Sequence, residues 1–166
     1  MATVTMKGKA VHTGGELPSI GSKAPNFTGT QRDMTELALS ELKGKNVILN
    51  VFPSLDTEVC ATSVRKFNKE ATSLHNTVVL AISKDLPFAQ GRFCTTEGIE
   101  RVMPLSVFRD TSFEEKYGML LEDGPLKGLL ARGVIVVNEA GEVVYTELVP
   151  EIAQEPNYEA ALACIR

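Results

Sequence analysis

The chain has 166 residues, which suits one domain with a hydrophobic core of its own. Apolar residues make up 43% and charged residues 23%, as in ordinary globular proteins, and the net charge of −4 argues against nucleic acid or an anionic membrane as the main partner. No stretch resembles a membrane span, and residues 1–9 lack the apolar core of a secretory signal. We therefore expect a cytoplasmic protein.

The first part of the chain predicts short strands. Residues 3–12 alternate as a β-hairpin that turns at Lys7-Gly8. Residues 27–30 and 35–37 are candidate short strands, and residues 39–44 predict a single helical turn closed by glycine.

The next stretch combines a strand, a tight turn and a helix. A continuous apolar run up to Phe52 predicts a strand that is buried on both faces. The run breaks at Pro53, and apolar residues then recur at roughly helical spacing as far as Phe67. This pattern places Cys60 in or just past the first turn of the helix.

The remaining elements alternate between strands and helices before a final hairpin. They are a strand at 77–83, a short helix at 88–94 after Pro87, a strand at 105–108, a helix at 112–117, a turn at 123–125, hairpin strands at 132–138 and 143–149, and a closing helix at 157–165. Parallel crossovers with a terminal antiparallel hairpin predict a mixed α/β sheet with helices on both faces. The order matches a thioredoxin-like fold, although other small mixed sheets share it. We expect one domain over residues 1–166, with residues 1–16 as an N-terminal hairpin extension.

The three cysteines are Cys60, Cys94 and Cys164. Three are too few for a disulfide framework in a chain of this length, and an odd number leaves at least one unpaired. A reducing cytosol favours catalytic, sensing or plain core roles for them. With two histidines and no Cys-x-x-Cys pair, a structural zinc site is not expected.

Cys60 is the first candidate for chemistry, although most free cysteines are simply small core residues. A helix N-terminus presents unpaired N–H groups and a partial positive charge, and both favour a thiolate over a thiol. The strand-to-helix junction is also where open α/β sheets place their ligand sites. Thr57 lies three residues earlier on the same helical face, where its hydroxyl could donate to a thiolate.

Pro53, Thr57 and Cys60 reproduce the Pro-x-x-x-Thr-x-x-Cys signature of the peroxiredoxins. The resemblance covers nearly the whole chain and is greatest to the bacterial thiol peroxidases, a subgroup of atypical two-cysteine peroxiredoxins. Further stretches that resemble this subgroup are residues 85–90 with 92–94, residues 123–126, residues 131–132 and residues 155–158.

The resemblance implies that Cys60 is the peroxidatic cysteine, whose thiolate attacks the peroxide and becomes a sulfenic acid. It gives Arg132 the task of stabilising the thiolate and binding the peroxide oxygens. Thr57 would orient the thiolate and the hydroperoxide, and Pro53 would pack over the pocket and limit water. Without the resemblance, Arg132 would be interpreted as a surface charge at a strand edge.

The resemblance makes Cys94 the resolving cysteine, which condenses with oxidised Cys60 into an intramolecular disulfide. The two Cα atoms must then come within about 4.4–6.8 Å. Cysteines on different helices rarely start so close, so we expect the first turn of the Cys60 helix and part of the Cys94 segment to unwind on oxidation. Cys164 has no matching role and is interpreted as packing or as an incidental thiol.

The resemblance implies a peroxidase that reduces hydrogen peroxide and organic hydroperoxides without a metal, haem or flavin. By resemblance, thioredoxin returns the electrons and the protein is a homodimer. A peroxide sensor that passes a disulfide to a partner protein would use the same two cysteines and stays open. A general thiol–disulfide oxidoreductase would need a Cys-x-x-Cys motif that is missing here, and a binding module with inert cysteines is the remaining alternative.

Overall fold

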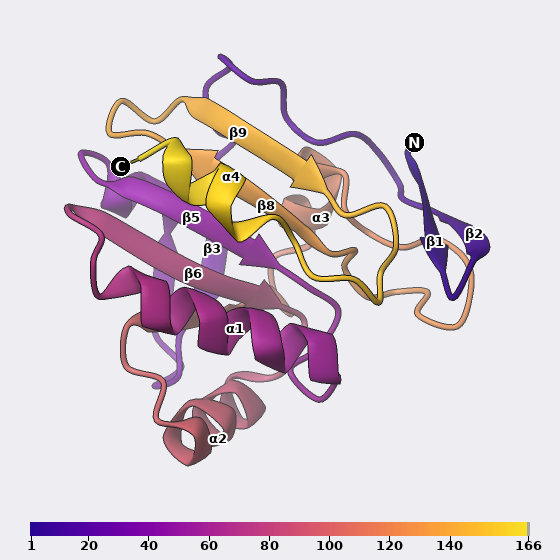
Figure 1. The fold of residues 1–166 in the computed structure, drawn as a ribbon, viewed down its shortest axis with the longest axis horizontal. Helices are drawn as coiled ribbons and strands as arrows, with labels where there is room; N and C mark the ends of the chain where they lie inside the picture. Colours follow the sequence, from indigo (N-terminus) through magenta and orange to yellow (C-terminus); the bar gives the residue numbers. More distant parts are fainter. Residues whose placement is uncertain (166) are drawn as a thin grey trace.

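A seven-stranded mixed sheet forms the centre of the computed structural model, which describes residues 1–165 (Figure 1). Its strands are β3 (Thr28–Thr30), β4 (Glu36–Ala38), β5 (Asn46–Val51), β6 (Thr77–Ser83), β7 (Val102–Ser106), β8 (Gly133–Val137) and β9 (Val143–Leu148). They lie in the order β4-β3-β7-β6-β5-β8-β9, in which β5, β6 and β7 are parallel and the other pairs are antiparallel. The predicted thioredoxin-like sheet is confirmed.

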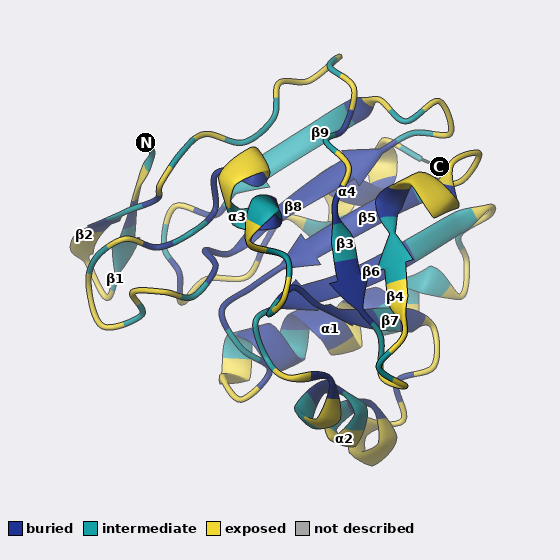
Figure 2. Cartoon of the chain, turned by 180° about the vertical axis from the view of Figure 1, so that it is seen from behind, coloured by how far each residue is buried: buried dark blue, intermediate teal, exposed yellow. Residues whose placement is uncertain are grey.

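Helices lie on both faces of this sheet. They are η1 (Leu39–Leu42), α1 (Glu58–Ala71), α2 (Pro87–Glu97), α3 (Thr111–Tyr117) and α4 (Tyr158–Ala163). Helices α1 and α4 cover the face turned to the viewer in Figure 1, and α3 lies on the opposite face, which Figure 2 shows. Within residues 1–165, no helix has the length and apolar character needed to cross a membrane.

The N-terminal hairpin forms a separate two-stranded sheet, as predicted. Strand β1 (Thr3–Met6) pairs antiparallel with β2 (Lys9–His12), and the turn residues Lys7 and Gly8 have φ angles of 50° and 81°. Positive φ at both turn positions matches the twist of the flanking strands, which explains the glycine at the second position. The hairpin is tied to the rest of the chain through Thr5, whose backbone exchanges hydrogen bonds with residues 150 and 152.

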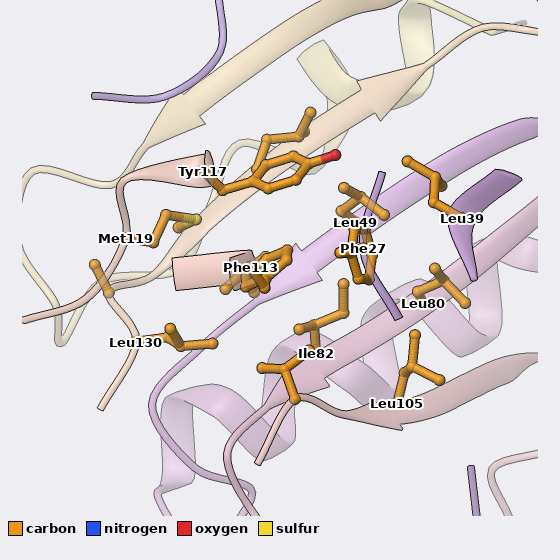
Figure 3. Close-up of a cluster of buried hydrophobic side chains, with 14 of the residues drawn as sticks. Phe27, Leu39, Leu49, Leu80, Ile82, Leu105, Phe113, Tyr117, Met119 and Leu130 are labelled. Atoms are coloured by element: carbon orange, nitrogen blue, oxygen red, sulfur yellow. The ribbon is translucent and has the colours of Figure 1, made fainter. Parts of the chain in front are cut away.

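Two apolar clusters sandwich the sheet. Alternate β5 residues face opposite sides, so Leu49 joins the cluster under α3, whereas Ile48 joins the one under α1 and α4. In the first cluster, Phe27, Phe113 and Tyr117 pack their rings against one another, close to the buried side chains of the central strands (Figure 3). The second cluster contains the buried Cys60 and Cys94.

Some element bounds differ from the prediction. Strand β7 begins at Val102 and contains Pro104, whereas the sequence predicted a strand at 105–108. Strand β3 pairs with β7 only through Ser106, so most of that edge of β7 carries no ladder and tolerates a proline. Helix α2 continues to Glu97, three residues beyond its predicted end. The closing helix α4 ends at Ala163, earlier than predicted.

Candidate active site

Cys60 is the third residue of α1 and its side chain is completely buried. Thr57 is the N-cap residue with extended backbone angles, and the amide of Ala61 is the first to donate within the helix, to the Thr57 carbonyl at 3.0 Å. The amides before it have no acceptor within the helix. The sulfur therefore lies in the first turn, as predicted, next to the partial positive charge of the helix N-terminus.

The Thr57 hydroxyl points to the sulfur instead of capping the helix. Its Oγ1 lies 2.6 Å from Cys60 Sγ and 3.0 Å from the Ser54 carbonyl oxygen, and it caps no backbone amide. A hydroxyl has one proton, so it donates to one of these two acceptors at a time. When the sulfur is a thiolate the proton serves Cys60, and when it is a thiol the S–H can donate to Oγ1 instead.

Arg132 reaches the same sulfur from the other side. It directly precedes β8, and the antiparallel pairing of Gly133 with Val51 places it beside the end of β5, next to the turn that leads to Cys60. Its Nη2 donates to Cys60 Sγ at 3.1 Å and its Nε to the Ile152 carbonyl oxygen at 2.8 Å. The structure thus brings Thr57 and Arg132 together on Cys60.

The burial of Arg132 excludes the alternative interpretation, in which it would be a surface charge at a strand edge. Only 2% of the residue is exposed, and among the described residues it forms no ion pair with a carboxylate. A buried guanidinium without a counter-ion is expensive, because the cation has lost its water. A thiolate at Cys60 is the group positioned to compensate it. Nη1 is buried without a hydrogen-bond partner, which leaves a donor for a further acceptor at the site.

Pro53 is buried in the turn between β5 and α1. The preceding residue, Phe52, still donates its amide to the Ile82 carbonyl oxygen at 3.1 Å, so the β5 register ends directly before the proline. Pro53 brings no amide proton that this buried turn would have to satisfy.

Cys94 lies in the second half of α2 and is also buried, with 3% of its surface exposed. Burial raises the pKa of the Cys94 thiol, and the nearby Arg32 offsets part of that effect. Burial in the folded protein thus disfavours the Cys94 thiolate. It belongs to the same apolar cluster as Cys60, and all three cysteines of the chain are free.

Cys164 is exposed at the end of α4, where its thiol lies 3.4 Å from the Ala160 carbonyl oxygen. It contributes nothing to the core, so the interpretation as a packing residue is wrong, and an incidental surface thiol is the interpretation that fits.

A group of polar residues was missed by the sequence analysis. The Asp85 carboxylate accepts hydrogen bonds from the Ser54 hydroxyl at 2.7 Å, the Leu55 amide at 2.8 Å and the Ser83 hydroxyl at 2.8 Å. The sequence contained a signal for this group, because Ser54 and Asp85 follow the carboxyl ends of the neighbouring parallel strands β5 and β6. Side chains at such positions meet at one edge of the sheet.

The site offers one sulfur, one hydroxyl and one guanidinium, which suits the binding of an oxygen acceptor. Residues 1–165 include no group of three His, Cys, Asp or Glu side chains placed to hold a metal ion. A cation next to the sulfur would also meet the positive charge of Arg132.

Comparison with known proteins agrees with the geometry. A family model described as Redoxin matches residues 19–162. Curated thiol peroxidases from Mycobacterium tuberculosis and Corynebacterium glutamicum are 58% and 55% identical to the chain over 165 residues, covering 99% of this chain and of each relative. The crystal structure of a peroxiredoxin-like protein from Aquifex aeolicus, 39% identical, superposes with a TM-score of 0.94 over 99% of this chain and 96% of that one. The chain therefore belongs to the Redoxin family, and within it to the thiol peroxidases.

Proposed function

We propose that this chain is a thioredoxin-dependent peroxidase that reduces hydrogen peroxide and organic hydroperoxides, with Cys60 as the attacking thiol and Cys94 as the resolving thiol. The chain belongs to the thiol peroxidases, and this supports a thiol-dependent peroxidase activity. The observation that carries the proposal is the buried Arg132, which has no carboxylate partner and donates to Cys60 Sγ at 3.1 Å.

In the first step, the Cys60 thiolate attacks the terminal peroxide oxygen. A sulfur–oxygen bond forms, the oxygen–oxygen bond breaks, and the leaving oxygen takes a proton to become water or an alcohol. The peroxide gains two electrons and Cys60 becomes a sulfenic acid. Arg132 can offer its unpartnered Nη1 to the charge that develops on the leaving oxygen, and Thr57 can hold the attacking sulfur through its hydroxyl proton.

In the second step, the Cys94 thiol attacks the Cys60 sulfur. The sulfur–oxygen bond breaks, water leaves with the thiol proton, and a disulfide forms. A dithiol of thioredoxin then reduces this disulfide by exchange and becomes a disulfide itself. The sum of the steps converts one hydroperoxide and one reduced thioredoxin into an alcohol, water and oxidised thioredoxin.

The test is thioredoxin-dependent peroxide consumption with thioredoxin reductase as the coupling enzyme. Cys60→Ser should abolish turnover, and Cys94→Ser should permit one reaction with peroxide but no recycling by thioredoxin. Cys164→Ser is the matched control, because this thiol is exposed and outside the site, and its turnover should equal that of the wild type. Activity that survives Cys60→Ser would overturn the proposal. Efficient disulfide transfer to another protein without thioredoxin turnover would instead indicate a peroxide sensor.

A further inference from the structure

Asp85 connects the segments that carry the two proposed redox cysteines. It lies at the junction of β6 and α2, half-buried, and its carboxylate holds the Ser54–Leu55 turn through two hydrogen bonds, from the Ser54 hydroxyl and the Leu55 amide. Its own backbone carbonyl accepts a hydrogen bond from the Ser106 hydroxyl at 2.6 Å, which fixes it to β7. The backbone of Asp85 is therefore fixed to the sheet, while its carboxylate holds the turn before α1 in place.

On the Cys60 side, Ser54 connects the Asp85 carboxylate to the sulfur through its contacts with Thr57. The Ser54 carbonyl oxygen accepts from the Thr57 amide at 3.1 Å and lies 3.0 Å from the Thr57 hydroxyl oxygen. That hydroxyl oxygen lies 2.6 Å from Cys60 Sγ. The position of Thr57 at the sulfur thus depends on Ser54, which Asp85 holds.

On the Cys94 side, the path runs through Ser83. The Ser83 hydroxyl donates to Asp85 at 2.8 Å and accepts from the Gln90 side-chain amide at 3.1 Å. Gln90 is completely buried in the first half of α2, one helical turn before Cys94. The α2 N-cap residue, Leu86, offers no side-chain capping bond, so this path braces the start of the helix.

We propose that Asp85 is a positioning residue that holds both cysteine segments in their folded form, so that it favours the peroxide step and restrains the disulfide step. The inference rests on the proposed function, in which Cys94 resolves Cys60. The peroxide step needs Thr57 and Arg132 at the sulfur, whereas we expect the disulfide step to need the first turn of α1 and part of the Cys94 segment to unwind. Loss of the carboxylate raises the population of the opened form, so the two steps change in opposite directions.

The decisive variant is Asp85→Ala, measured in two backgrounds. With Cys94→Ser added, stopped-flow measurements give the rate of Cys60 oxidation by hydrogen peroxide alone. With Cys94 present, they give the rate of disulfide formation. We expect Asp85→Ala to slow the first rate about tenfold and to accelerate the second by a similar factor, since hydrogen bonds to a charged group are lost. The Cys60 sulfenic acid then has less time to meet a second peroxide, so the fraction oxidised to sulfinic acid at high peroxide should fall.

Asp110→Ala is the matched control. The Asp110 carboxylate is also half-buried and also accepts three hydrogen bonds, from the Thr28 amide and from the amide and hydroxyl of Ser112, but it caps α3 on the other face of the sheet. This variant should lose comparable stability and leave both rates unchanged. Asp85→Asn should restore most wild-type behaviour, because its oxygen can still accept from Leu55 and Ser83 while its amide donates to Ser54 Oγ.

Equal effects of Asp85→Ala and Asp110→Ala on the two rates, or slowing of both steps by Asp85→Ala, would overturn the inference. If Asp85→Ala does not fold, Ser54→Ala can replace it, because it removes one hydrogen bond to the carboxylate. Ser54→Ala should also slow the oxidation of Cys60 and accelerate disulfide formation, by smaller factors. Unchanged rates would refute the role of Asp85. Failure of the proposed function is recognised separately, since the wild-type protein would then form no Cys60–Cys94 disulfide.

Discussion

At the scale of single residues, Thr57 serves the sulfur more than the helix that it begins. Its hydroxyl makes no capping bond, and its extended backbone suits a β-branched side chain. We therefore expect Thr57→Val to slow the oxidation of Cys60 by peroxide about 10–100-fold, the value of a hydrogen bond to a charged group, with little loss of stability. Single-turnover oxidation and urea denaturation measure the two effects.

Thr57→Ser is the control for that substitution, because it keeps the hydroxyl and should keep most of the rate. An unchanged rate would show that the hydroxyl has no special role at the sulfur, and a large loss of stability in Thr57→Val would show that it supports the helix as well.

The residues at the site were not equally predictable. Cys60 and Thr57 lie three positions apart on one helix, so local spacing was enough to bring them together. Arg132 is 72 residues from Cys60, and its burial results from the pairing of β8 with β5, which no local pattern reveals. The resemblance to a family suggested its role, and the structure shows that its buried guanidinium has no carboxylate partner among the described residues. Asp85 belonged to a matching stretch, but its hydrogen bonds depend on the meeting of two strand ends.

At the scale of elements, α2 contains one residue that disfavours a helix. Gly91 lies in its interior, where glycine costs roughly 1 kcal/mol relative to alanine. A brace from outside comes from Arg32, whose Nη2 donates to the Gly91 carbonyl oxygen at 3.2 Å and to the Thr95 hydroxyl at 2.9 Å. A glycine inside the helix would ease the release of Cys94 that the proposed cycle requires.

The pKa of Cys94 predicts a pH dependence of stability. Burial raises this pKa in the folded state above the unfolded value of about 8.5, so the folded protein binds more protons in the range between the two values. The stabilising contribution is complete below the unfolded pKa and is lost as the pH rises through the folded one. We expect the free energy of unfolding of the reduced protein to fall more steeply above about pH 8.5 in the wild type than in Cys94→Ala, as measured by urea denaturation.

Cys164→Ala provides the comparison for that experiment, because the Cys164 thiol is exposed and its removal should leave the slope unchanged. Identical slopes in the wild type and Cys94→Ala would contradict the assignment of a raised pKa to Cys94.

Element bounds were predictable where local signals are strong. The buried strand β5, the start of α1 and the N-terminal hairpin follow from periodicity and turn chemistry, and all three were found. Strand β7 was displaced because Pro104 argues locally against a strand, whereas pairing with β6 overrides it. The end of α2 was missed because Thr95 and Thr96 give no stop signal, and the helix ends only at Gly98, which has a φ of 66°.

At the scale of the whole molecule, the two faces of the sheet have different tasks. The face that carries α3 holds an aromatic cluster, whereas Cys60 and Cys94 lie in the cluster of the other face. Phe113 is completely buried in the first cluster, so Phe113→Ala should lower the free energy of unfolding by about 3–5 kcal/mol. At low denaturant, where the variant is still folded, the rate of Cys60 oxidation should stay close to that of the wild type.

Urea denaturation and single-turnover oxidation on the same sample check both parts of this expectation. A large fall in the rate for the folded variant would mean that the aromatic cluster on one face of the sheet controls the site on the other face, which would contradict the expectation.

The N-terminal hairpin is connected to Arg132 through Ile152. Its Thr5 accepts a hydrogen bond from the Ile152 amide at 2.8 Å, and the Ile152 carbonyl oxygen in turn accepts from Arg132 Nε at 2.8 Å. We infer from this connection that the hairpin and the sheet act as one domain. The homodimer expected from the family resemblance stays a prediction, which sedimentation of the reduced protein would test.

The central claim is that Cys60 and Cys94 are partners in one redox cycle, and one measurement tests it directly. Reduced protein is treated with one equivalent of hydrogen peroxide, free thiols are alkylated, and the peptides are analysed by mass spectrometry without reduction. The account predicts an intramolecular disulfide between Cys60 and Cys94, with Cys164 recovered as an alkylated free thiol. Recovery of Cys94 as a free thiol while Cys60 is oxidised, or a disulfide of Cys60 with Cys164, would contradict it.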